Sequence, residues 1–102
     1  MKYSGTKIMI GGSEFVFSPL SLGSIESMKD ELANLGSEDL VVQAKTAVSI
    51  AHASLKRNYS EMTREEVSDM IDLSNFKEII EAVMNVSQMK ASTEGKGGPS
   101  GE

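Results

Sequence analysis

The chain contains no cysteine and no tryptophan, and His52 is the single histidine among its 102 residues. The absence of cysteine excludes a disulfide scaffold, a thiolate zinc site and a cysteine nucleophile. A catalytic triad or a histidine metal site needs partners of fixed geometry, which a lone histidine lacks. We therefore expect a structural or surface role for His52, and a protein that holds no metal.

Long apolar runs and dense positive charge are also missing. No stretch approaches the roughly 18 apolar residues of a membrane span, and no basic and then apolar start suggests a signal peptide. The net charge is −5, from 15 acidic and 10 basic residues. Because nucleic-acid binding depends largely on neutralising phosphates, such a chain is poorly suited to it. We expect a cytosolic protein whose partners include neither membrane nor nucleic acid.

The first part of the chain predicts a β-hairpin. Two β-rich runs, at residues 7–10 and 14–17, flank the turn sequence Gly11-Gly12-Ser13. A lone hairpin is marginal in water, so it must pack on helices or pair with another copy. At the other end, residues 91–102 hold four glycines, one proline and no large apolar side chain. We expect this tail to be disordered, and residues 1–90 to form a single domain.

Apolar residues at helical spacing predict helices after the hairpin. The first, at about residues 21–35, has Ser21 as N-cap and is followed by Gly36, which can adopt a positive φ at the C′ position. The longest, at about residues 37–58, has Ser37 as N-cap and an alanine-rich stripe. Small residues there let another helix approach closely, so we place this helix at the centre.

Two further helices complete the pattern. Thr63-Arg64-Glu65-Glu66 forms a capping box at the start of a short helix. After Asp72-Leu73-Ser74-Asn75, a last helix runs to about residue 88. Its apolar face comprises Phe76, Ile79, Ile80, Val83 and Met84. The sequence thus predicts an α+β fold, with an N-terminal β-hairpin followed by a mostly helical bundle of about four helices.

The last helix has a wider apolar face than one core stripe requires. Ile80 and Met84 continue around it toward the side that also holds Met70. We predict a partner-binding surface that includes Met70, Phe76, Ile80 and Met84. The alternative is that all of these residues are ordinary core, which is the usual outcome for apolar residues at helical spacing.

Several short motifs occur in a recognisable order. Pro19-Leu20-Ser21-Leu22-Gly23 precedes the first helix, and Arg57-Asn58-Tyr59 is followed by Thr63-Arg64-Glu65-Glu66 and Asp72-Leu73. In order and spacing these motifs resemble the small tail assembly chaperones of long-tailed bacteriophages, over about residues 6–88. The family often has proline where Ser18 and Ser60 stand here. Neither departure removes a chemical group that a chaperone would need.

The resemblance implies a protein of a phage or prophage that is not an enzyme and acts in the host bacterial cytoplasm without a cofactor. It would bind the tape measure protein and help recruit tail tube subunits, with self-association as a further possibility. Seven methionines are consistent with an adaptable surface for a helical client. One alternative is a small structural tail-completion or adaptor protein of the virion. Another is an acyl or peptidyl carrier, although Asp72-Leu73-Ser74 transposes the Asp-Ser-Leu order of that site.

Overall fold

The hairpin forms where the sequence predicts it. The structure is a computed structural model that describes residues 2–89, so the predicted tail at 91–102 lies outside the described residues. Strands β1 (Thr6–Ile10) and β2 (Ser13–Phe17) pair antiparallel, with Ile8 opposite Phe15. Gly11 and Gly12 form the turn with φ values of 58° and 85°. Two successive positive φ angles match the right-handed twist of the strands, and glycine adopts them without strain.

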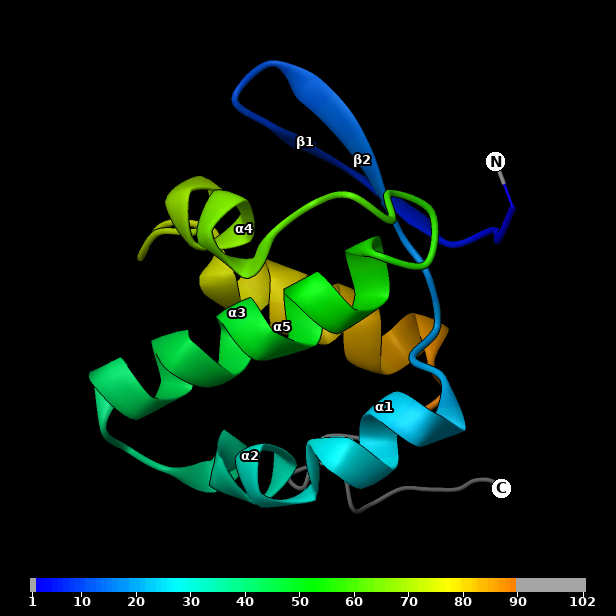
Figure 1. Cartoon of the computed structure of the whole chain (residues 1–102). Coiled ribbons are helices and arrows are strands. Elements are labelled where there is room, and N and C mark those ends of the chain that lie inside the picture. The colour runs from blue at the N-terminus through cyan, green and yellow to red at the C-terminus, as the bar shows by residue number, and fades with distance from the viewer. Residues whose placement is uncertain (1, 90–102) are drawn as a thin grey trace.

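Helices follow the hairpin, which confirms the predicted α+β fold (Figure 1). The elements in chain order are α1 (Leu22–Ser27), α2 (Lys29–Ala33), the 3-10 turn η1 (Asn34–Gly36), α3 (Leu40–Leu55), α4 (Arg64–Met70) and α5 (Phe76–Val86). The hairpin stands at one end of the molecule beside α4, and α1 and α2 lie at the opposite end. Helix α3 runs between them and packs against α5, α4, β2 and α2, so its predicted central position is confirmed.

The prediction of one continuous helix at about residues 21–35, ended by Gly36, is wrong. Ser21 does cap α1, since the Ser24 amide donates to its hydroxyl at 3.1 Å. The helix breaks at Met28, however, and α2 ends in η1 rather than at a glycine of positive φ. Among the described glycines only Gly11 and Gly12 have positive φ, so Gly36 does not. The break places Met28 in the core, whereas α1 and α2 themselves bury no residue fully. Tertiary packing therefore outweighs the local helical pattern.

The start of α3 also differs from the prediction. Its N-cap is Asp39, whose carboxylate accepts from the amides of Val41 (2.9 Å) and Val42 (3.4 Å). Ser37 instead accepts a hydrogen bond from the Asp39 amide. A carboxylate at the N-cap accepts hydrogen bonds from free amides, and its negative charge interacts favourably with the positive end of the helix dipole. A serine hydroxyl offers the hydrogen bonds without the charge.

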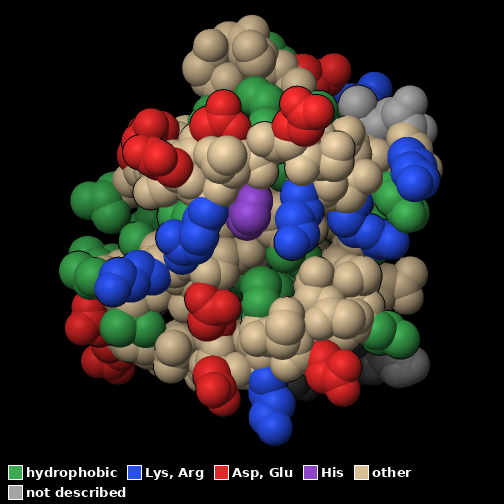
Figure 2. All heavy atoms as spheres, viewed as in Figure 1, with side chains coloured by type: hydrophobic (Ala, Val, Ile, Leu, Met, Phe, Trp, Pro, Cys, Tyr) green, Lys and Arg blue, Asp and Glu red, His purple; other side chains and the backbone are tan. Residues whose placement is uncertain are grey.

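One side of α3 reaches the surface, and cations collect there. Figure 2 shows lysine and arginine side chains in a row along this helix, with the histidine among them. His52 is half-buried, and its Nε2 lies 3.0 Å from the Met62 carbonyl oxygen. His52 therefore ties α3 to the segment before α4, which is a structural role of the kind that we expected.

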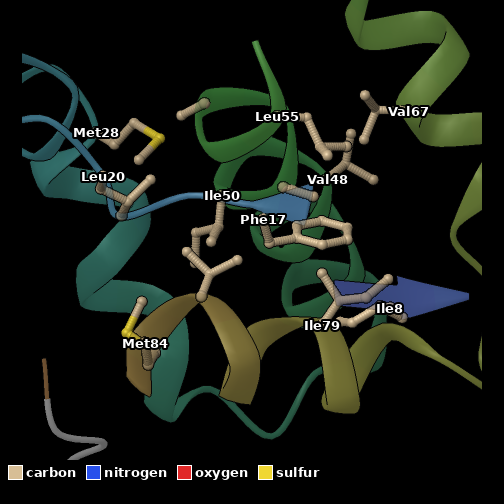
Figure 3. Packing of buried hydrophobic residues seen from close by; sticks show 13 residues of the cluster. Ile8, Phe17, Leu20, Met28, Val48, Ile50, Leu55, Val67, Ile79 and Met84 are labelled. Carbon is tan, nitrogen blue, oxygen red and sulfur yellow. The ribbon is translucent and has the colours of Figure 1, made fainter. Parts of the chain in front are cut away.

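The opposite side of α3 joins the hydrophobic core. Figure 3 shows the Phe17 ring of β2 lying between α3 and α5, with Leu55 and Val48 on one side and Ile79 on the other. Phe17, Leu55 and Ile79 are fully buried, as are Ala47 and Ala51 of the alanine-rich stripe. The core thus takes its members from the hairpin and from the helices together, and the hairpin does not stand alone.

Phe76→Ala is expected to lower the free energy of unfolding by about 3 kcal/mol, because a large buried side chain is replaced by a cavity. Phe76 is 3% exposed. Urea denaturation measures the change. Leu73→Ala is the control, since Leu73 is 71% exposed and its loss should alter stability by less than about 0.5 kcal/mol. Equal midpoints for Phe76→Ala and the wild type would contradict this account.

Thr63→Ala is expected to cost about 1 kcal/mol of stability through loss of the capping box. The box is present: the Glu66 amide donates to Thr63 Oγ1 (3.1 Å), and the Thr63 amide donates to Glu66 Oε1 (2.9 Å). Ser68→Ala, an exposed change within the same helix, should leave stability unchanged or slightly raised because alanine favours helix. If both variants unfold at the same urea concentration, the box contributes nothing.

Candidate functional site

The end of α3 holds the hairpin in place. Asn58 Nδ2 donates to the Tyr3 carbonyl (2.7 Å) and to Ser18 Oγ (2.9 Å), and the Tyr3 amide donates to Asn58 Oδ1 (2.7 Å). Arg57 Nη1 donates to the Pro19 carbonyl at 2.7 Å, and its guanidinium lies 4.0 Å from the centre of the Tyr3 ring. Two of the motifs that carry the resemblance therefore contact each other through Arg57 and Pro19, which lie 38 residues apart in the sequence.

Tyr59, the next residue, covers part of the free edge of β2. Its hydroxyl accepts a hydrogen bond from the Val16 amide at 3.0 Å. Its ring meets Phe15 edge to face, with the ring centres 5.9 Å apart and the planes at 70°. This is a favourable aromatic geometry, so Tyr59 and Phe15 form one wall that belongs to the hairpin and to the α3–α4 segment together.

A groove runs from this wall along α4, between the hairpin and the helices. It consists of two surface hollows, of about 740 and 730 Å³, that share Phe15, Asp69 and Met70. We call it the hairpin groove. Its apolar lining residues are Met9, Ile10, Phe15, Tyr59, Met62 and Met70. Its acidic lining residues are Glu61, Glu66, Asp69, Asp72 and Glu78.

The chemistry of the hairpin groove is apolar and negatively charged. Three of the seven methionines line it, and one of them, Met9, is 64% exposed. No lysine or arginine of residues 2–89 lines either hollow. Hydrogen bonds from the Ser74 hydroxyl (2.6 Å) and amide (2.9 Å) lower the pKa of Asp72, so this carboxylate stays ionised in mildly acidic solution. The groove thus combines methionine and aromatic side chains with a border of carboxylates.

The four residues that the sequence selected for partner binding lie in two places. Met70 is half-buried and lines the hairpin groove. Phe76 and Met84 are only 3% and 4% exposed, and with the half-buried Ile80 they line a separate hollow of about 640 Å³ beside η1. The structure thus brings three of the four together without Met70. Partner binding by these residues stays a prediction.

The sequence interpretation missed most of the groove. It did not select Phe15, Tyr59, Met62 or Asp69, which meet Met70 there. Tyr59 lies in one of the recognised motifs, but that signal says nothing about which surface the residue reaches. The groove depends on where the hairpin stands relative to α4, and no local pattern in the sequence specifies that position.

Comparisons with known protein families, with curated proteins and with solved structures find no match for this chain. None of the helices in the described part is long and apolar enough to cross a membrane. Within residues 2–89, no three histidine, aspartate or glutamate side chains are grouped so as to hold a metal ion.

Asn58→Ala is expected to lower the free energy of unfolding by about 1–3 kcal/mol, because three partly buried polar groups lose their partner. Urea denaturation measures this cost. Amide hydrogen exchange should show that the variant exchanges faster than the wild type in β1 and β2, with a smaller increase in α5. Asn85→Ala, an exposed change on α5, is the matched control. Hairpin amides that exchange at the wild-type rate would show that Asn58 does not fix the hairpin.

Proposed function

We propose that this protein is a tail assembly chaperone of a phage or prophage. It binds the tape measure protein in the host bacterial cytoplasm and helps recruit tail tube subunits. The order and spacing of the motifs at residues 19–23, 57–59, 63–66 and 72–73 support this proposal. The observation that carries it is the hairpin groove, an open surface lined by methionine, aromatic and acidic side chains.

The groove has the properties that a chaperone for an amphipathic helix requires. Such a client needs its apolar face covered, and a groove between two elements covers one face of a helix while leaving the other in water. Methionine side chains are flexible and polarizable, so they can adapt to different apolar residues along a long client. The groove walls come from the hairpin and α4, which are joined to the core at their bases through Phe17 and Val67.

In this proposal, the recognised residues that follow α3 hold the hairpin in position. Asn58 and Arg57 fix the segment around Ser18 and Pro19, and Tyr59 fixes β2. Together they hold the hairpin wall of the groove at a constant position. A client would thus meet a preformed surface, which lowers the entropic cost of binding.

The test is co-expression with a fragment of the tape measure protein from the same phage or prophage. Met70→Glu and Met9→Glu should each reduce the amount of fragment kept in solution at least tenfold, because a charge then faces the client's apolar side. Met9 is 64% exposed, so its replacement leaves the core intact. Val41→Glu, an equally exposed change outside the groove and outside the recognised motifs, is the control.

Circular dichroism establishes that each variant is folded. Folded Met70→Glu and Met9→Glu variants that keep the fragment soluble as well as Val41→Glu does would contradict the role of the groove. Presence of the protein in purified virions would favour the alternative of a structural tail-completion or adaptor protein, because an assembly chaperone is released before the particle is complete.

A further inference from the structure

Charge is unevenly distributed over the surface of this acidic protein. Figure 2 shows aspartate and glutamate side chains over α4 and the segment before it, with hydrophobic atoms between them and the hairpin. The row of lysine, arginine and histidine side chains along α3 lies below them on the same face. Acidic side chains border this row on both sides, and the cations of the row do not line the hairpin groove.

The carboxylates of the groove come from successive elements. Glu61 precedes α4, Glu66 and Asp69 lie on α4, Asp72 follows it, and Glu78 lies on α5. All five are exposed. They represent a third of the 15 acidic residues of the chain, and no cation of the described residues lines the groove to neutralise them. Negative charge thus accompanies the apolar lining over the whole length of the groove.

We infer that the hairpin groove binds an amphipathic helix whose apolar face is flanked by lysine and arginine. The apolar face would rest on Met9, Met62 and Met70, and the flanking cations would lie beside the carboxylates. This inference rests on the proposed function and specifies the class of client. A helix with acidic flanks is repelled by the same carboxylates, so charge selects the partner, while the apolar contact holds it.

The same argument disfavours a second copy of this chain as the occupant. The net charge of the chain is −5, so two copies repel each other at long range. Its most amphipathic helix, α5, has Glu78 and Glu81 against a single cation, Lys77. If this helix of a second copy entered the groove, its carboxylates would lie beside those that line the groove.

Two designed helical peptides test the inference on the whole protein. Both have leucine at the same positions on one face; one has lysine flanks and the other has glutamate flanks. Fluorescence anisotropy measures their dissociation constants at low and at high salt. We expect the lysine peptide to bind at least about tenfold more tightly at low salt, with a smaller difference at high salt because exposed charges are screened.

A pair of matched variants assigns the effect to the groove. Glu61→Gln with Asp69→Asn removes two groove carboxylates that make no cap, and should reduce the preference for the lysine peptide several-fold. Glu26→Gln with Asp30→Asn removes the same charge from exposed positions on α1 and α2 and should leave the preference unchanged. If the two double variants behave alike, the net charge and not the groove selects the peptide, and the inference fails.

The remaining outcomes separate this inference from the proposed function. Equal binding of both peptides, lost in Met9→Glu, overturns the charge selection but leaves a helix-binding chaperone. A third outcome is that neither peptide binds, while Met9→Glu still fails to keep the tape measure fragment soluble. This result also overturns the inference, because the groove then binds the client in a form other than an amphipathic helix. Self-association that Met9→Glu abolishes would assign the groove to a second copy of this chain instead.

Discussion

The fold depends on burying part of the connection between β2 and α1 against the ends of α3 and α5. Ser18 is fully buried; its carbonyl accepts from Ser54 Oγ (2.7 Å), and its hydroxyl accepts from Asn58. The Leu20 amide donates to Ser87 Oγ at 2.9 Å. Buried backbone groups without partners are costly, so the end of α3 and the end of α5 must both supply polar side chains at this point. The positions of these two helices are thereby fixed relative to the strand.

The same constraint places the hairpin. Its base is held in the core by Ile8 and Phe17, and the chain passes so close there that a Cβ on Gly5 would lie 2.1 Å from the Phe17 carbonyl oxygen. Only glycine fits that approach. The distal part of the hairpin extends beyond the core, so Ile10 and Phe15, which share one face of the hairpin, line an open groove beside α4. Because only the base of the hairpin is packed in the core, the base is stable and the side chains near the tip stay accessible.

Several local signals in the sequence predicted local structure, although the N-cap at Ser37 and the positive φ at Gly36 were wrong. The Gly11-Gly12 turn, the cap at Ser21 and the capping box at Thr63 each depend on a few neighbouring residues, and each is confirmed. The break at Met28 was missed because it depends on packing against distant elements. The groove was missed for the same reason: Met70 was selected by residue type, but its neighbours there include Phe15, and only the tertiary structure brings the two together.

A chaperone must hold its client firmly enough to prevent aggregation and weakly enough to release it. Contacts with methionine are non-directional and tolerate changes in the client's side chains, so they supply affinity without a fixed register. Exposed carboxylates contribute little affinity individually but accelerate encounter and exclude helices of the wrong charge. A groove that combines the two therefore favours fast, selective and reversible binding. In the function that we propose, a helix bound in this way would be displaced readily when tube subunits polymerise around it, since no single strong contact would have to be broken first.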